Sequence, residues 1–398
     1  GEVVIGALAP LSRTGSLLTG FAMQTAFSIA ADELNAAGGV GGKPVRLITY
    51  DTAGSADQAG RFAERLILLD CAAVLVGGYN TQVALAIKAV AQKYGTPVIF
   101  SGAAQDELTA DAAPEVFRIN PTTGMMAAMP AQWLAEVGDY NGDHERHVVL
   151  IAENNTDARA YFERVRQNLI DAGFAVEVLT VELPASDFSP VIARIVALDL
   201  VPDAVLIGVS GDAAFALQQQ MLAAGIGPQQ RTLLVTNSSA LNDTLFWNRM
   251  PNGLYTVVSR LGPWPSTVSA RGAQFVEKFR TYFDRWPDIY TFAAYDAVLL
   301  AGDAIQRAAS LDGSAIITAL EQSDVELASG RYHFAYSAMH PPDGESEPAY
   351  WWHQWLDAPL LYLQYAEPNQ PASAAPVIWP PLYRTVDAPV LSQPGAQP

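Results

Sequence analysis

The chain has 398 residues, of which 50% are hydrophobic and 16% charged, and its 23 basic and 41 acidic residues give a formal net charge of −18 at pH 7. This length suggests two or three domains, and the composition excludes disorder as the main state. An acidic chain repels phosphate backbones and anionic lipid, so binding to nucleic acid or to a membrane surface is excluded as a leading function. The single cysteine, Cys71, precedes a buried strand pattern, and we expect an unreactive core thiol.

The sequence has no apolar run of about 18 residues, so it predicts no transmembrane helix. It opens at Gly1 and enters an apolar run at once, without the charged and hydrophobic regions of a signal peptide. We interpret this beginning as that of a protein without a leader or of a mature form whose leader has been removed.

Short β-rich runs alternate with helical patterns in the first part of the chain. Apolar residues at three- and four-residue spacing predict a helix through Met23 and Leu34, which ends at Gly38-Gly39. Alternating strands and helices imply right-handed crossovers and a mostly parallel sheet. The expected strands are 3–9, 45–50, 74–77 and 97–100, and the further helices are 57–69 and 81–94.

The pattern pauses at 117–121 and then restarts as a second α/β unit. Its expected strands are 147–151, 175–181, 204–208 and 232–235, and its helices are 124–137, 157–172, 188–198 and 212–224. A strand at 253–258 and helices at 266–285, 292–310 and 314–321 follow. The tail predicts β-hairpin strands at 331–336, 350–355 and 360–365, with Trp351, Trp352 and Trp355 in hairpin packing, and an extended Pro-rich segment from Glu367.

The sequence contains no pattern that is typical of a catalytic or metal-binding site. The glycine run from Gly38 to Gly42 lacks the spacing of a phosphate loop, and Gly208-Val209-Ser210-Gly211 is one residue short of a nucleophile elbow. His144 and His147 have neither zinc-site spacing nor a third ligand nearby. The sequence therefore favours a binding protein without a metal or cofactor over an enzyme.

Polar loops follow the predicted strands of both units. Open α/β sheets bind ligands outside the carboxyl ends of their strands, where helix starts offer N–H donors and Arg13 offers a positive charge. Similar residues also form ordinary helix caps and solvent-exposed loops, and this alternative stays open. The expected contact residues are Arg13, Tyr79, Asn80, Thr81, Ala103, Ala104 and Gln105 in the first unit and Asn154, Asn155, Val209, Ser210, Asn237 and Ser238 in the second.

Several stretches resemble the branched-chain amino-acid-binding family of ABC transporter substrate-binding proteins. They are 3–12 (VVIGALAPLS), 33–44 (ELNAAGGVGGKP), Tyr50-Asp51, 107–109, 116–118 and 294–297. The resemblance covers nearly the whole chain, and 35–44 is its most specific part. It implies a type I periplasmic-binding-protein fold, in which two doubly wound parallel-sheet lobes are joined by three crossings. We expect lobe one at 1–120 plus 255–331, and lobe two at 121–254 plus 332–398 with the hairpins and the tail.

The resemblance also implies a ligand site, although this sequence departs from the family pattern there. Asn80 and Thr81 occupy the place of the hydroxyl residues that bind the ligand's carboxylate. The threonine expected at 103–105 is absent, and the tyrosines that cover the ligand correspond to Ala158 and Val209. The acid that binds the ammonium falls at Asn237 or Ser238. A ligand without an ammonium group, such as an amide or an organic or aromatic acid, therefore fits better than an aliphatic amino acid, unless Asp106, Glu153 or Asp157 replaces the acid.

The implied function is that of an extracytoplasmic solute-binding protein of an ABC importer. The resemblance implies a monomer that captures a small polar ligand in the cleft between its lobes by closure, and a membrane permease as its partner. It places the protein in the periplasm or outside the cell, either free or lipid-anchored. The alternatives are a ligand-sensing receptor of the same fold and, from another class, an α/β hydrolase.

Overall fold

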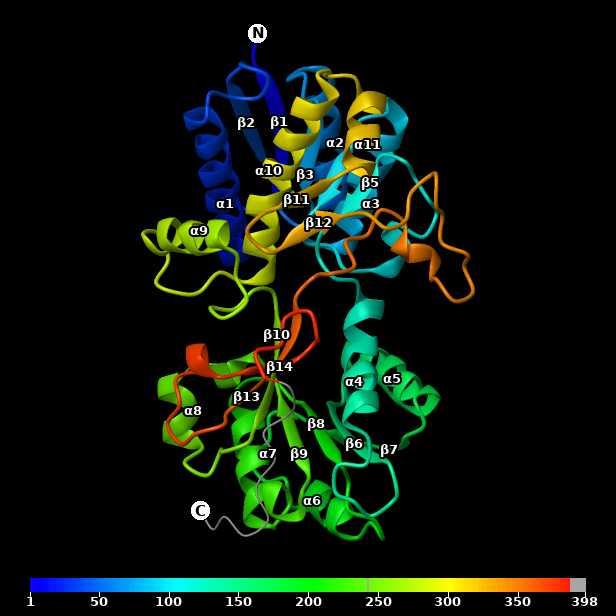
Figure 1. Ribbon diagram of the computed structural model, residues 1–398, viewed down its shortest axis with the longest axis vertical. Coiled ribbons are helices and arrows are strands. Elements are labelled where there is room, and N and C mark those ends of the chain that lie inside the picture. The colour runs from blue at the N-terminus through cyan, green and yellow to red at the C-terminus, as the bar shows by residue number, and fades with distance from the viewer. Residues whose placement is uncertain (242, 387–398) are drawn as a thin grey trace. The chain divides into compact units, whose positions relative to one another are not determined.

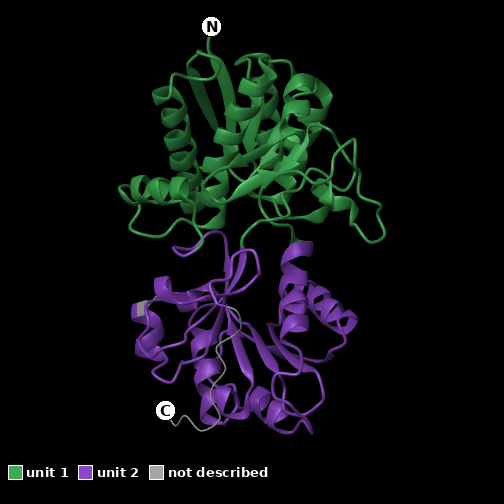
Figure 2. Cartoon of the chain, viewed as in Figure 1, with its two compact units in different colours: residues 1–123, 267–359 green, residues 124–266, 360–398 purple. Residues whose placement is uncertain are grey.

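Two α/β units make up the chain, and the backbone passes between them three times. The computed structural model describes residues 1–241 and 243–386. Unit 1 comprises 1–123 and 267–359, and unit 2 comprises 124–266 and 360–398, as Figure 2 shows in two colours. No helix in the described ranges has both the length and the apolar character needed to cross a membrane.

Unit 1 is built on a sheet of five parallel strands in the order β2-β1-β3-β4-β5 (Figure 1). Strand β1 is buried along its whole length, as expected for a parallel strand covered on both faces. All five strands run in the same direction, so their carboxyl ends lie at one edge of the sheet. The strands are β1 (Val3–Ala9), β2 (Val45–Asp51), β3 (Val74–Gly77), β4 (Val98–Phe100) and β5 (Val116–Arg118).

Helices cover both faces of this sheet. Helix α1 packs against α10, and α2 packs against α3. Right-handed crossovers place α1 on one face and α2 with α3 on the other. Helix α3 ends where Gly95 takes the left-handed conformation, with φ of 64°. The helices of unit 1 are α1 (Leu17–Ala36), α2 (Ala56–Leu68), α3 (Thr81–Tyr94), α9 (Ala270–Arg280), α10 (Ile289–Ala308) and α11 (Gly313–Glu321).

Unit 2 repeats this strand order and extends it. Its parallel part runs β7-β6-β8-β9-β10, and β13 and β14 continue the sheet antiparallel beyond β10. The strands are β6 (His147–Glu153), β7 (Ala175–Val181), β8 (Ala204–Gly208), β9 (Leu233–Thr236), β10 (Val257–Leu261), β13 (Leu360–Gln364) and β14 (Val377–Trp379). One face carries α4 (Thr123–Val137) and α5 (Thr156–Asp171), and the other carries α6 (Ser189–Val196) and α7 (Gly211–Ala223). The remaining helix is α8 (Asp243–Arg249).

The segment that follows α11 differs from the expected hairpins. Strands β11 (Asp324–Glu326) and β12 (Arg331–His333) form a short antiparallel pair, but 350–355 is not a strand. A 3-10 turn at Ala349–Trp351 stands there instead. The tryptophans still pack as structural residues, since the indole N–H groups of Trp352 and Trp355 donate to the carbonyls of Ala113 and Arg331.

The observed boundaries of the units differ from the expected lobes at the second and third crossings. Residues 255–266 lie in unit 2, because β10 is the fifth parallel strand of that sheet. Residues 332–359 lie in unit 1, because Gln354 and His353 bond to strand β5. The last part of the expected extended tail, 387–398, lies outside the described residues. Cys71 is exposed, so the expectation of a core thiol is wrong.

A buried carboxylate fastens part of this late segment to α10. Asp296 is fully buried and accepts hydrogen bonds from the N–H groups of Ala328 and Ser329, at 2.8 and 2.9 Å, and from the hydroxyl of Tyr332 at 2.8 Å. Burial raises the pKa of Asp296 to about 6, and these donors oppose the rise. The segment 328–332 is therefore held by one ionisable group.

We expect the contribution of Asp296 to stability to fall as the pH rises from about 4 to about 6, because only the folded chain keeps a proton on this carboxyl in that window. A shift of about two pKa units corresponds to about 3 kcal/mol. Urea unfolding of the wild type and Asp296→Asn at several pH values measures the difference in their free energies of unfolding. The pKa assignment fails if that difference is the same at pH 4 and pH 6.

Candidate functional site

The carboxyl edge of the unit 1 sheet brings three loops together. Backbone hydrogen bonds continue past the strands, since Gly78 N–H donates to Leu8 O and Ala103 N–H donates to Gly78 O, each at 3.0 Å. A Cβ atom on Gly102 would lie 2.7 Å from both Gly78 O and Tyr79 Cα, so this close approach requires a glycine. The loop after β3 is thus joined through its backbone to strand β1 and to the loop after β4, and Tyr79 lies beside the loop that carries Ala103.

The loop from Ala103 to Gln105 is held in place by two buried polar side chains at the end of β5. The guanidinium of Arg118 donates to Gln105 O, to Thr109 Oγ1 at 2.7 Å and to Gln354 Oε1 at 2.6 Å. Asn120 Nδ2 donates to Ala103 O at 3.2 Å. Burial lowers the pKa of Arg118 to about 10, so it still carries its charge at neutral pH.

Sequence reasoning missed both Arg118 and Asn120 as residues that support the site. The available signal was an arginine and an asparagine that interrupt an apolar run just before a proline. Such a polar pair at the end of a buried strand must find partners, and here it finds them in the neighbouring loop.

Helix α3 begins at this edge without a side-chain cap. Asn80 stands at the N-cap position with extended backbone, but its side chain makes no capping bond. In contrast, Ser55 caps α2 and Asp288 caps α10. The first-turn N–H groups of α3 therefore remain available, and so does the exposed amide of Asn80. Such a helix start suits a carboxylate or another anion.

The other predicted site residues of unit 1 differ in their exposure and in their contacts. Tyr79 is half-buried, and its ring meets the edge of Tyr290 with centroids 5.1 Å apart. Thr81 is also half-buried, in the first turn of α3. Arg13 is exposed in the loop after β1, and no described residue pairs with its guanidinium. The structure thus brings 79–81 and 103–105 together and leaves Arg13 as a free cation of the loop after β1.

In unit 2, local hydrogen bonds occupy most of the predicted polar side chains. Asn155 caps α5 by accepting from Ala158 N–H at 2.8 Å, and Asn154 bonds with Glu182 and Arg159. Asn237 donates to Val209 O and accepts from Ser239 N–H.

The remaining residues predicted in unit 2 differ in what they can offer a ligand. Ser210 bonds to Glu153 through both its N–H and its hydroxyl. The side chain of Val209 is buried, whereas Ser238 is exposed. The structure therefore shows local roles for Asn154, Asn155, Ser210 and Asn237, and ligand contact at these positions stays a prediction.

Comparison with known proteins agrees with this architecture. The sequence profile described as periplasmic binding protein matches residues 2–355. Leu/Ile/Val-binding protein homolog 8 of Brucella abortus (strain 2308) is 36% identical over 126 residues, which are 32% of this chain and 31% of that protein. The match thus spans about a third of the length of this curated relative.

Solved structures resemble the whole chain. A putative branched-chain amino acid ABC transporter protein from Silicibacter pomeroyi has a TM-score of 0.76 at 20% identity, over 99% of this chain and 100% of that one. A solute-binding protein of an ABC transporter from Rhodopseudomonas palustris BisB5, in complex with 3,4-dihydroxy benzoic acid, has a TM-score of 0.64 at 19% identity, over 91% and 93%. These similarities confirm the expected type I periplasmic-binding-protein fold.

Substitution of Asn80 and Asn155 tests whether α3 lacks the side-chain cap that α5 has. We expect Asn155→Ala to lower the free energy of unfolding by about 1 kcal/mol, because the side chain caps α5. Asn80→Ala removes no capping bond, so we expect a change below about 0.5 kcal/mol. Urea unfolding of both variants in parallel measures this contrast. An equal loss in the two variants would show that Asn80 caps α3 in solution.

Proposed function

This chain belongs to the periplasmic binding protein family, and we propose that it binds a small polar solute outside the cytoplasm and delivers it to an ABC importer. In this proposal the protein acts as a monomer in the periplasm or at the cell surface, and its partner is the membrane permease of that importer. The observation that carries the ligand class is the uncapped start of α3 beside Asn80.

The polar groups of unit 1 fit the carboxylate of a solute. The N–H groups of the first turn of α3 and the amide of Asn80 donate hydrogen bonds, and Thr81 adds a hydroxyl. Hydrogen bonds to a charged group contribute about 1.5 to 3 kcal/mol each. The backbone of 103–105, fixed by Arg118 and Asn120, adds a rigid wall to the same site. Arg13 is the cation of this unit that we expect to approach the bound anion.

The acids that could replace the family's ammonium-binding acid have other surroundings in the described structure. The positions that correspond to the family's acid are Asn237 and Ser238. Glu153 already accepts bonds from Ser210 and Asn155, and Asp106 lies in the field of the Arg118 guanidinium. The third acid, Asp157, is exposed to solvent in the first turn of α5. A desolvated ammonium without a carboxylate is costly, so we propose an organic or aromatic acid, or an amide, rather than leucine.

The loops of unit 2 are proposed to complete the ligand site. In this proposal Asn154, Asn155, Ser210 and Asn237 contact the solute mainly through backbone groups and free lone pairs, because their side chains already bond within unit 2. Val209 contacts the solute through its backbone, and Ser238 through its exposed side chain. A solute that engages both units favours the closed state by the difference in its affinity for the two states.

A thermal-shift screen of the full chain tests this function. We expect aliphatic and aromatic acids to raise the melting temperature, whereas leucine and valine do not. A solute at about 100 times its dissociation constant stabilises the folded state by about 2.7 kcal/mol, which is a shift of a few degrees. A strong shift with leucine alone would overturn the proposed ligand class, and no shift with any small solute would overturn the function.

Asn80→Ala tests where the solute binds. We expect this variant to weaken the best acid about ten- to a hundredfold by calorimetric titration, because one hydrogen bond to a carboxylate is lost. Ser55→Ala is the matched control, since Ser55 caps α2 and has no proposed role in binding. Equal affinity in Asn80→Ala and the wild type would remove Asn80 from the site.

A further inference from the structure

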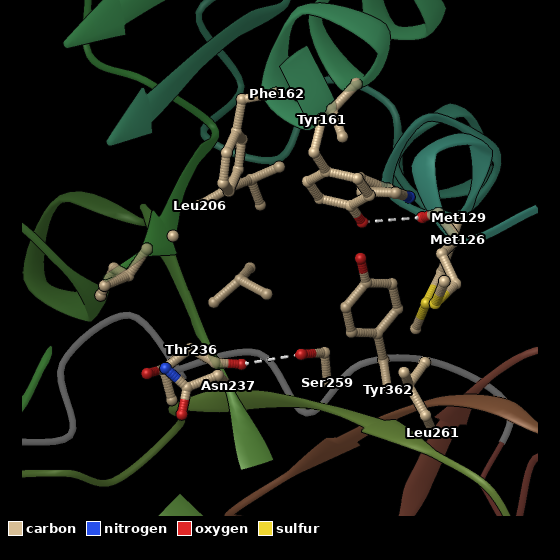
Figure 3. A pocket seen from close by; sticks show the side chains of 15 residues that line it. Met126, Met129, Tyr161, Phe162, Leu206, Thr236, Asn237, Ser259, Leu261 and Tyr362 are labelled. Carbon is tan, nitrogen blue, oxygen red and sulfur yellow. Dashed lines mark hydrogen bonds between the residues drawn. The ribbon is translucent and has the colours of Figure 1, made fainter. Parts of the chain in front are cut away.

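Unit 2 contains a cavity of about 230 Å³ between one face of its sheet and helices α4 and α5. Aliphatic, aromatic and sulfur-containing side chains line its wall, among them Met126 from α4, Tyr161 and Phe162 from α5, and Tyr362 from β13 (Figure 3). None of the described residues that line the cavity carries a charge. The cavity belongs to unit 2 alone and reaches the carboxyl ends of β8 and β9 at Gly208 and Asn237.

Tyr362 directs an unpaired hydroxyl into this cavity. The side chain is only 2% exposed, and its ring packs on Trp133 with centroids 4.4 Å apart. Among the described residues, no atom forms a hydrogen bond with its Oη, which points into the cavity toward Tyr161 (Figure 3). Burial raises the pKa of Tyr362 well above its usual value, so the group is a neutral donor. Because this hydroxyl faces the cavity without a partner in the described part of the chain, an oxygen or nitrogen of a ligand there would accept its hydrogen bond.

Two further hydroxyls in the wall have lone pairs to offer. Tyr161 Oη donates to Met126 O at 3.2 Å, and Ser259 Oγ donates to Thr236 O at 3.2 Å. Because each hydroxyl uses its proton in these bonds, each can still accept one. These three hydroxyls thus offer one donor and two acceptors within a largely apolar surface.

The size and charge of the cavity restrict what can occupy it. An apolar cavity of about 150 Å³ binds benzene, so about 230 Å³ accommodates a ring with about three further non-hydrogen atoms. A carboxylate or an ammonium inside would lose its hydration without gaining a charged partner. The chemistry of the wall therefore selects an uncharged ring with one hydrogen-bonding group.

We propose that this cavity is a binding site for an uncharged aromatic or alicyclic ring, whose oxygen or nitrogen accepts a hydrogen bond from Tyr362. The ring belongs either to a separate small molecule or to the apolar end of the transported solute. The inference rests on unit 2 alone and does not depend on the transport role.

Calorimetric titration of the full chain with phenol, indole, toluene and benzylammonium tests the site. We expect the neutral rings to bind and benzylammonium to bind at least about tenfold more weakly than phenol. Tyr362→Phe keeps the ring that packs on Trp133 and removes only the hydroxyl. We expect it to weaken phenol about three- to tenfold and to leave toluene unchanged. Tyr140→Phe is the control, a buried tyrosine of the same core that does not line the cavity.

A second variant fills the cavity. Leu206→Phe adds volume at a lining position on β8, and we expect it to abolish the binding of every neutral ring. Circular dichroism and a cooperative urea unfolding transition show that this variant is folded. The proposal is overturned if the wild type binds no neutral ring at millimolar concentration, or if both variants bind phenol like the wild type. Competition between indole and the solute found in the screen identifies the ring as part of that solute, and simultaneous binding identifies a separate molecule.

Discussion

Parallel strand pairing is the constraint on which both units depend. Because every strand of the unit 1 sheet runs in the same direction, the loops after β1, β3 and β4 meet at one edge. The backbone bonds of Gly78 with Leu8 and Ala103 extend the pairing beyond the strands themselves. Residues 79–81 and 103–105, which are distant in sequence, therefore face the same space. The gathering of these loops at one edge is a consequence of strand direction.

Buried polar side chains hold the loops at this edge and the late segment of unit 1 in place. Arg118 uses all its nitrogens on partners in unit 1, and these partners come from the loop after β4 and from the late segment at Gln354. The carboxylate of Asp296 likewise holds the segment 328–332, because it accepts hydrogen bonds from the N–H groups of Ala328 and Ser329. Satisfied buried groups of this kind hold loops in one conformation, because any movement leaves a charge or a carbonyl without a partner. A rigid loop loses little conformational entropy when a solute binds.

Sequence periodicity predicts the regular strands and helices, but it does not predict where the segment 332–359 packs. Strands such as 3–9 and helices such as 81–94 follow from local apolar patterns, and the structure has them at those residues. The third crossing was misplaced because 332–359 has no period of its own. Its position depends on bonds with strand β5, more than 200 residues away, that no local pattern contains. Strand β5 itself has three residues and ends in Arg118, so its pattern is too short to identify.

The two units differ in the chemistry that they leave available, although they share a strand order. In unit 1 the uncapped start of α3 and the side chain of Asn80 remain free for a ligand. In unit 2 the amide of Asn155 caps its own helix and the amide of Asn237 bonds to the loop after β8, whereas an apolar cavity holds the hydroxyl of Tyr362. Sequence composition suggested equal polar roles for the two sets of loops, because it cannot tell a free amide from one that caps a helix. The hydrogen bonds separate them: unit 1 leaves polar donors at a helix start, and unit 2 leaves an apolar cavity.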